Sequence, residues 1–198
     1  MLLVERLIVA YDLASALAYM HENSLIYRDI KQENFGFDIR GDIKIFDFGL
    51  SKALSPTLLA KKSKTMYNLT PVTGSIPYMA PEVTLKLPYN CRCDCFSFAL
   101  LFHEILALRK TPFHTYPPQE YFQRVVKGNE RPTIRTSWPA TNVLKNGWDF
   151  DPGKRPPMKS IASMIRSELY ERSEQDSVLN RSMYMNDKSI RSLQGLDC

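Results

Sequence analysis

The residues best suited to catalysis or metal binding lie together in the segment 27–50 of the chain. Asp29, Lys31 and Asn34 are close neighbours there, and Asp47 follows after a short interval. A carboxylate such as that of Asp29 can accept a proton, and a lysine beside it can balance the charge of a phosphate. The carboxylate of Asp47 and the amide oxygen of Asn34 are the kind of ligand that Mg²⁺ takes in proteins. The segment therefore predicts proton transfer next to a phosphate or a metal ion.

A β-hairpin is expected to position these side chains. Two short β-like runs, Asn34–Asp38 and Ile43–Phe46, are joined by the polar turn Ile39–Asp42. Antiparallel pairing folds such a hairpin back on itself. Asn34 and Asp47 are then expected to lie side by side at one end of it.

Helices are expected for most of the remaining chain. Apolar residues recur at helical spacing from Leu3 to Glu22, and Asn23 is a suitable stop. Further helical patterns span Asp94–Leu108, Gln119–Lys127 and Met158–Tyr170. The predicted fold class is thus mainly α with a small β-hairpin.

Three sequence blocks resemble the protein kinase family. Tyr27–Asn34 (YRDIKQEN) is similar to the H/Y-R-D-x-K-x-x-N pattern of its catalytic loop, and Asp47–Gly49 to its D-F-G metal-binding loop. Gly74–Glu82 (GSIPYMAPE) resembles its G-T/S-x-x-Y-M-A-P-E segment. A single short motif carries little weight, whereas three in order at workable spacing indicate a kinase of the Ser/Thr or tyrosine-kinase-like group.

The resemblance implies phosphoryl transfer from ATP to Ser or Thr hydroxyls of protein substrates. Asp29 is the expected catalytic residue that orients the hydroxyl and accepts its proton, and Lys31 is expected to steady the γ-phosphate. Asn34 and Asp47 are expected to bind ATP through Mg²⁺. Ser75 is expected to tie Asp29 to Lys31 by hydrogen bonds, and Lys31 with Ser75 favours Ser/Thr specificity.

Other matching positions are expected to support this site. Phe48 would pack inward and set whether the preceding aspartate faces the site, and Gly49 lets the backbone turn. Asp94 would accept backbone N–H groups from the catalytic loop, and it would also suit the N-cap of its helix. Arg155, in a segment that resembles the closing W-x-x-D-P-x-x-R-P block of kinases, would form a buried pair with Glu82.

The polar stretch Leu50–Thr73 matches the kinase activation segment and is expected to be irregular. Arg28, just before the catalytic aspartate, is typical of kinases in which a phosphate orders this segment, because arginine can bind phosphate through two nitrogens. Thr70 and Thr73 are the candidate phosphorylation sites nearest the expected position, with Thr65 and Tyr67 further away. For each of them, an ordinary solvated loop is an equal alternative.

The chain also departs from the family pattern. Kinase domains begin with an N-terminal lobe that carries a Gly-rich loop and a lysine on its third strand, whereas the resemblance covers only residues 2–170 here. Gly36 stands where kinases usually place an apolar side chain under the adenine. The segment Ala140–Gly147 is shorter than the usual helix at that place, so an incomplete helix is expected.

Two functions follow from this pattern. The first is a Ser/Thr kinase catalytic lobe, residues 1–170, that lacks its N-terminal lobe, has little activity by itself and binds ATP with Mg²⁺ weakly. The second is a catalytically inactive lobe that acts as a protein-binding module. The Ser-rich segment 171–198 is expected to be a disordered or loosely helical tail.

Composition limits the class of protein. With 198 residues, 44% of them hydrophobic and 24% charged, the chain is long enough for one domain with a sizeable core. The net charge of +5 comes without a long basic run, so no nucleic-acid partner is expected. No signal peptide or membrane span is apparent, which predicts an intracellular, cytoplasmic protein.

Three cysteines crowd into Cys91–Cys95. Metal binding is one interpretation, but a C-x-C-x-C pattern without a second ligand group is a poor zinc signature. The favoured interpretation is that these are small apolar residues at the start of a helix in a reducing compartment.

Overall fold

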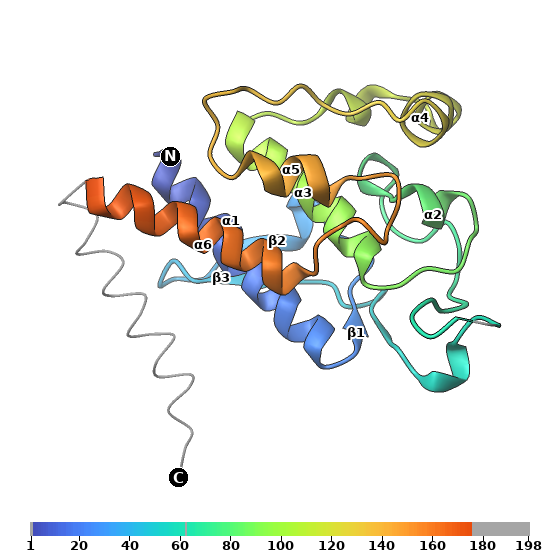
Figure 1. The fold of residues 1–198 in the computed structure, drawn as a ribbon. Coiled ribbons are helices and arrows are strands. Elements are labelled where there is room, and N and C mark those ends of the chain that lie inside the picture. Colours follow the sequence, from blue (N-terminus) through green and yellow to red (C-terminus); the bar gives the residue numbers. More distant parts are fainter. Residues whose placement is uncertain (1, 62, 176–198) are drawn as a thin grey trace, which may run out of the picture.

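Three long helices form the body of the fold: α1 (Leu3–Glu22), α3 (Arg92–Ala107) and α6 (Met158–Gln175). Helix α1 packs against both of the others, and its long axis runs beside α6 (Figure 1). The computed structural model describes residues 2–61 and 63–175. The shorter helices and strands are β1 (Leu25–Ile26), β2 (Phe35–Phe37), β3 (Ile43–Ile45), β4 (Lys52–Ala53), α2 (Pro81–Thr84), α4 (Pro118–Tyr121) and α5 (Thr141–Gly147).

Helix α1 has the predicted bounds, and its sequence explains them. Leu7, Leu13 and Leu17 lie on one face at spacings close to the helical repeat, and all three are buried. Burying a leucine side chain contributes about 1.5–3 kcal/mol, so this stripe holds the helix in the core. The helix ends at Asn23, whose N–H still donates to carbonyls of the last turn.

Helix α3 lies at the centre of the core and is buried on almost all sides. It begins at Arg92, so the expectation that Asp94 caps the helix is wrong: Cys91 is the N-cap, and Asp94 lies inside the first turn. The carboxylate of Asp94 is fully buried and serves another segment of the chain. The helix stops at Leu108, which has the left-handed backbone angle φ of 53°.

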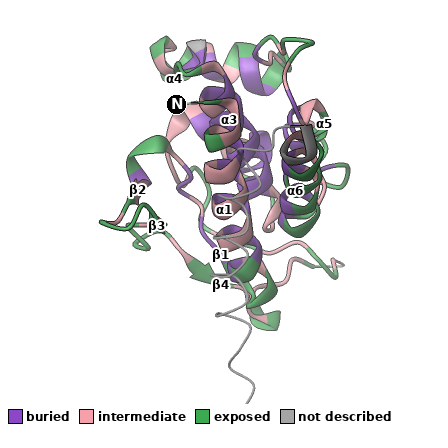
Figure 2. Ribbon diagram, turned by 90° about the vertical axis from the view of Figure 1, so that its left-hand side faces the viewer, coloured by how far each residue is buried: buried purple, intermediate pink, exposed green. Residues whose placement is uncertain are grey.

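The predicted hairpin is present as β2 and β3, with Phe35 opposite Ile45 and Phe37 opposite Ile43. Its strands are slightly shorter than expected because the backbone pairing changes at Asp38, whose N–H donates to the Asp42 carbonyl and closes the turn. Figure 2 shows this hairpin standing away from the helical body, with exposed or partly exposed residues. A second antiparallel pair joins β1 to β4.

Two helices differ from the sequence prediction. The segment expected as one helix is α4 followed by a π-helical stretch, Phe122–Lys127, in which the Gly128 N–H donates to the Gln123 carbonyl. Val125 and Val126, two consecutive residues of this stretch, are both buried.

Helix α6 continues past its expected end to Gln175. An ion pair between Glu168 and Arg172, 2.9 Å apart and one turn from each other, supports this extension. The first residues of the expected tail are therefore helical, and the rest of the tail lies outside the described residues. Helix α5 is short, as expected for Ala140–Gly147.

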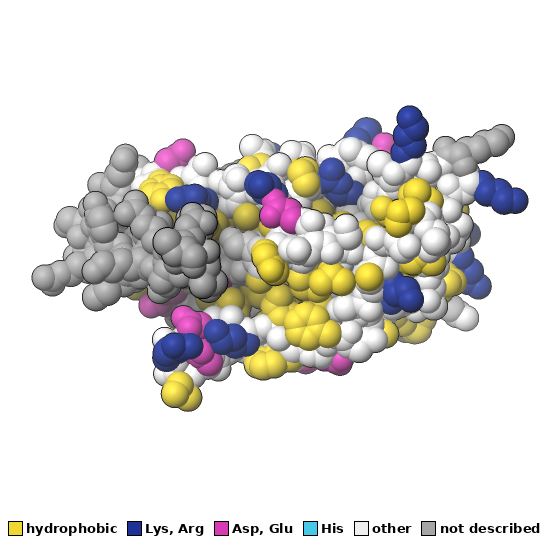
Figure 3. All heavy atoms as spheres, turned by 90° about the horizontal axis from the view of Figure 1, so that it is seen from below, with side chains coloured by type: hydrophobic (Ala, Val, Ile, Leu, Met, Phe, Trp, Pro, Cys, Tyr) yellow, Lys and Arg dark blue, Asp and Glu magenta, His cyan; other side chains and the backbone are white. Residues whose placement is uncertain are grey.

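Apolar side chains also reach the surface. In Figure 3 they gather along the middle of the face seen from below. In the hairpin and just after it, the exposed large apolar residues are Phe37, Ile39, Phe46 and Phe48. Among the described residues, no helix has both the length and the apolar character needed to cross a membrane.

Candidate active site

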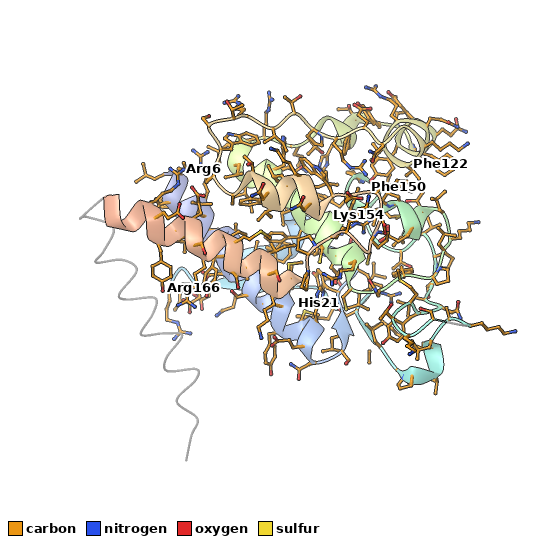
Figure 4. All side chains as sticks on the ribbon, viewed as in Figure 1. Arg6, His21, Phe122, Phe150, Lys154 and Arg166 are labelled. Atoms are coloured by element: carbon orange, nitrogen blue, oxygen red, sulfur yellow. The ribbon has the colours of Figure 1, made fainter. Side chains whose placement is uncertain are left out.

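The carboxylate of Asp94 holds the start of the catalytic-loop segment, Tyr27–Asn34, through its backbone. One carboxylate oxygen accepts the backbone N–H of Tyr27 and the other accepts that of Arg28, both at 2.9 Å. His21 Nε2 lies 2.8 Å from the same carboxylate, and Figure 4 shows His21 near the end of α1, beside β1. These bonds stabilise Arg28 at a φ of 71°, a conformation that side-chain-bearing residues seldom adopt. The predicted contact between Asp94 and this loop is thus present.

Asp29 is buried, and three side chains donate hydrogen bonds to its carboxylate. Lys31 Nζ lies 2.7 Å from Oδ2, Asn34 Nδ2 lies 3.0 Å from Oδ2, and Ser75 Oγ lies 2.8 Å from Oδ1. Burial raises the pKa of Asp29, but these hydrogen bonds outweigh it and the net shift is downward. Asp29 is therefore ionised at neutral pH. Ser75 and Lys31 each donate to Asp29 but form no hydrogen bond with each other. The expected link between Ser75, Asp29 and Lys31 is therefore made through the Asp29 carboxylate.

Ser75 reaches Asp29 because the preceding residue is glycine. Gly74 has a φ of 100°, and a Cβ at this position would collide with the Arg28 carbonyl. Only glycine allows both the angle and the close approach. The segment 74–75 can thus pass directly over the catalytic loop.

We expect Ser75→Ala to raise the pKa of Asp29 toward the ordinary value of about 3.9, because one donor to the charged form is lost. A group with a lowered pKa stabilises the fold above its unfolded pKa, and this contribution disappears as the pH falls through the folded pKa. The variant should therefore lose less stability on acidification. A ¹³C NMR titration of the carboxyl group measures the shift. Ser97→Ala is the matched control, since that hydroxyl donates to the Tyr78 carbonyl; an unchanged Asp29 pKa in Ser75→Ala would contradict the assignment.

Asn34 and Asp47 lie at the open end of the hairpin. The Phe46 N–H donates to the Asn34 carbonyl at 2.8 Å, so Asp47 follows immediately after the residue paired with Asn34. The Asn34 amide nitrogen donates to Asp29, so the amide oxygen of Asn34 does not take part in these two hydrogen bonds. Asp47 is exposed, and its Oδ1 accepts the Gly49 N–H at 3.1 Å.

This donor set fits Mg²⁺. Magnesium is usually held by one or two protein oxygens together with phosphate oxygens and water, rather than by a closed protein cage. A carboxylate and an amide oxygen satisfy that requirement. The residues described by the structure include no cluster of three or more histidine, cysteine or acidic side chains suited to a metal.

Tyr27 has a structural role that the sequence interpretation did not assign. Its ring is fully buried, and its hydroxyl donates to the Phe46 carbonyl at 2.6 Å. Burial raises the pKa of Tyr27, so the hydroxyl keeps its proton and remains a donor. The sequence signal for this role was the position of Tyr27 immediately before Arg28 and Asp29.

The expectation that Phe48 packs inward is wrong for this structure. About half of its side-chain surface is exposed, and its ring meets Tyr27 edge-on with centroids 5.8 Å apart. Tyr27 supports one edge of the Phe48 ring, and the described residues leave much of the rest open.

Arg28 is held by protein groups in this structure. Its Nε donates to the Leu50 carbonyl at 2.6 Å, and its Nη1 donates to the Tyr89 hydroxyl at 3.2 Å. Tyr89 in turn donates to the Thr70 carbonyl, and Thr73 Oγ1 donates to the same carbonyl. Both candidate phosphorylation sites therefore lie on the segment that Arg28 contacts through Tyr89, a residue that the sequence interpretation did not single out.

The segment 50–73 is more ordered than expected. Strand β4 pairs with β1, and Tyr67 pairs through its backbone with both Leu59 and Tyr89. Such main-chain pairing depends on segments distant in the sequence, which is why the polar composition alone predicted an irregular loop.

The predicted pair between Glu82 and Arg155 is present and bidentate. Nη1 lies 2.6 Å from Oε1 and Nη2 lies 2.8 Å from Oε2, with both side chains almost fully buried. Arg155 also donates to the carbonyls of Asp149 and Phe150. In Figure 4 the labelled Phe150 and Lys154 mark the loop that carries Arg155 toward α2.

The cysteine cluster does not resemble a metal site. Cys93 and Cys95 are buried within α3, and no disulfide joins the cysteines in the described part of the chain. Burial raises the pKa of Cys91 and Cys95 to about 12 and also raises that of Cys93, which keeps the thiols protonated. Buried, protonated thiols act as small apolar side chains, so the favoured interpretation is supported.

Comparison with known proteins agrees with this geometry. The protein kinase domain family matches residues 5–180. The serine/threonine-protein kinase STY17 of Arabidopsis thaliana is 31% identical over 165 residues, which cover 82% of this chain and 27% of that protein. The serine/threonine-protein kinase VIK of the same plant is 34% identical over 163 residues, 79% of this chain and 36% of that protein.

A relative of a different specificity class is also similar. The dual specificity protein kinase shkB of Dictyostelium discoideum is 31% identical over 162 residues, 79% of this chain and 23% of that protein. The chain thus spans between about a quarter and a third of the length of these relatives. With the catalytic-loop, D-F-G and A-P-E segments in their places, the chain belongs to the protein kinase domain family.

Proposed function

We propose that the chain is the catalytic lobe of a Ser/Thr protein kinase that transfers the γ-phosphate of ATP to protein hydroxyls. The observation that carries the proposal is the ionised Asp29 carboxylate, held by Lys31, Asn34 and Ser75. A positioned carboxylate beside a lysine is the arrangement that phosphoryl transfer to an alcohol requires.

The reaction follows from these groups. The substrate hydroxyl oxygen forms a bond to the γ-phosphorus of ATP, the bond from that phosphorus to the bridging oxygen breaks, and ADP leaves. The hydroxyl proton passes to Asp29. Because the pKa of Asp29 is low, the carboxylate is a weak base that mainly orients the hydroxyl and takes the proton late.

Lys31 and the hairpin complete the charge balance. Lys31 lies 2.7 Å from Asp29 and can stabilise negative charge on the transferred phosphoryl group. Asn34 and Asp47 would hold Mg²⁺, which when bound supplies positive charge to the phosphate oxygens. Tyr27 would keep Asp47 in register by holding the backbone carbonyl of the preceding residue.

We expect phosphate on serine and threonine, not on tyrosine. Lys31 in the catalytic loop and Ser75, whose hydroxyl donates to Asp29, support this specificity, because they stand where Ser/Thr-specific kinases carry lysine and a hydroxyl residue. The test is phosphoamino-acid analysis of a generic protein substrate, using the chain fused behind the N-terminal lobe of an active relative. Phosphotyrosine as the main product would overturn the specificity, and no transfer at all would favour the alternative of a protein-binding lobe.

A further inference from the structure

A pocket of about 350 Å³ lies at the C-terminal end of α3. One wall is formed by His103, Arg109 and Lys110, and the other by the segment 130–133. Figure 1 shows the chain between the π-helical stretch and α5 passing this end of α3. The volume lies within the range of sites that hold small molecules, which begins at about 300 Å³. None of the residues assigned to phosphoryl transfer lines this pocket.

His103 joins the two walls of the pocket. Its Nε2 lies 3.2 Å from the Thr133 carbonyl oxygen, which can only accept a hydrogen bond, so Nε2 carries a proton. The imidazole stands edge-on to the Trp138 ring, with centroids 5.0 Å apart. Burial lowers the pKa of His103, so the ring is neutral at pH 7 and Nδ1 has no proton. Nδ1 has no hydrogen-bond partner among the residues that the structure describes, so it can take up a proton when negative charge comes near.

Arg131 brings to the pocket a positive charge that its backbone contacts do not neutralise. Its Nε donates to the Trp148 carbonyl at 2.8 Å, and its Nη1 donates to the carbonyls of Val125 and Glu130. Within the described ranges the guanidinium forms no ion pair, and Nη2 has no hydrogen-bond partner. Burial lowers the pKa of Arg131 to about 10, so the side chain stays protonated at neutral pH. Because buried charges are normally paired, this one leaves an unbalanced positive charge beside the pocket.

Arg109 adds a second unbalanced charge. Its side chain is exposed and forms no hydrogen bond or ion pair with the part of the chain that the structure describes. Lys110 and Glu130, the other charged residues of the pocket, each pair with an oppositely charged side chain, at 2.8 and 2.6 Å. Those pairs are internally balanced, which leaves the two positive charges of Arg109 and Arg131.

We propose that this pocket binds a phosphomonoester group. Such a group carries a charge of about −1.5 to −2 at pH 7, which matches two positive charges, whereas a carboxylate matches only one. Arg109 is exposed and can bind two phosphate oxygens through its fork of N–H groups. The charge of Arg131 is largely shielded from water and attracts the anion through a medium of low dielectric constant. The inference does not depend on the proposed function.

The end of α3 does not oppose this assignment. A helix carries partial negative charge at its C-terminus, which disfavours a nearby anion. The Leu106 carbonyl in the last turn of α3 accepts a hydrogen bond from Arg6 Nη1 at 2.9 Å, and Figure 4 shows Arg6 at the start of α1. Arg6 therefore adds positive charge where the helix end is negative.

The test titrates the full chain with methyl phosphate, without nucleotide or Mg²⁺, and follows the His103 ring by NMR. The chain has only three histidines, so this ring signal can be separated from the others. Methyl phosphate should shift the signal and raise the pKa of His103, because a nearby negative charge favours the imidazolium form. Glu104 and Arg109, the charged groups that already act on this ring, are the same with and without the ligand. Acetate, with a single charge, should bind more weakly.

Variants of Arg109 separate binding from folding, because this side chain is exposed. Arg109→Ala should weaken methyl phosphate binding about 10-fold, the usual effect of losing a hydrogen bond to a charged group. Arg109→Lys keeps the charge but not the fork, so it should lose less. Arg135→Ala is the matched control, since Arg135 is an exposed arginine that lies over the Trp138 ring and does not line the pocket. The thermal midpoint of each variant checks that it is folded.

A peptide that contains phosphoserine distinguishes the two sources of a phosphomonoester. Tighter binding of the peptide than of methyl phosphate identifies a phosphorylated protein segment, and equal or weaker binding identifies a small organic phosphate. The site is refuted if methyl phosphate leaves the His103 ring unchanged, if acetate binds as tightly, or if Arg109→Ala binds as well as the wild-type chain. Because the assay contains no nucleotide or Mg²⁺, a negative result leaves the proposed function untouched.

Discussion

Replacing Asp29 with alanine is expected to reduce phosphoryl transfer by about 10²- to 10⁴-fold, the usual contribution of a positioned acid–base group. The variant removes the carboxylate that orients the substrate hydroxyl and takes its proton. It also releases Lys31, which forms an ion pair with Asp29. The measurement is the rate of phosphate transfer to a Ser/Thr peptide by the chain fused behind an N-terminal kinase lobe.

Two further variants show that the loss comes from the position of the carboxylate. Asp29→Asn keeps the shape of the side chain but cannot take the proton, so its activity should fall to a similar level. Asp42→Ala removes an exposed carboxylate from the turn of the hairpin and should leave the rate unchanged. Wild-type turnover in Asp29→Ala would exclude Asp29 from the mechanism.

The candidate site was largely predictable because its residues are local in the sequence. Asp29, Lys31 and Asn34 lie in one loop, and their types and spacing are enough to indicate which side chains meet. The long helix α1 was equally clear, since its apolar positions repeat over many turns. A regular period or a short motif carries such information without any knowledge of the rest of the fold.

What the sequence did not indicate depends on contacts between distant segments. Tyr89 bridges Arg28 and Thr70 from the far side of the activation segment, and nothing in its neighbourhood marks it. The helical pattern around Asp94 suggested an N-cap, and only the resemblance to kinases indicated its contact with the catalytic loop. The Phe46 ring over Gly36 likewise needs the register of the hairpin, which apolar residues alone do not fix.

The second large effect is expected at the pair between Glu82 and Arg155. This pair links α2, at the end of the activation segment, to the loop before α6. Arg155 also lies over the Phe96 ring, with its guanidinium carbon 5.0 Å from the ring centroid. The two charges are almost excluded from water, so each depends on the other for compensation.

Each single replacement by alanine, Glu82→Ala or Arg155→Ala, should destabilise the fold by about 3–5 kcal/mol, because the remaining charge stays buried without a partner. That loss is a large part of the 5–15 kcal/mol, roughly, that stabilises a typical domain. The double variant should lose much less than the sum, since it leaves neither charge behind. Urea unfolding of the four proteins gives the coupling energy.

An exposed ion pair provides the matched control. Lys159 and Glu22 are 2.7 Å apart, but both side chains are largely in water, so replacing either should change the unfolding midpoint little. The comparison isolates burial as the cause, because both pairs join a lysine or arginine to a glutamate at similar distance. If the two single losses at Glu82 and Arg155 simply add in the double variant, the pair does not act as a unit. The activation segment would then have to be fixed to the lobe by its backbone pairing with Tyr89.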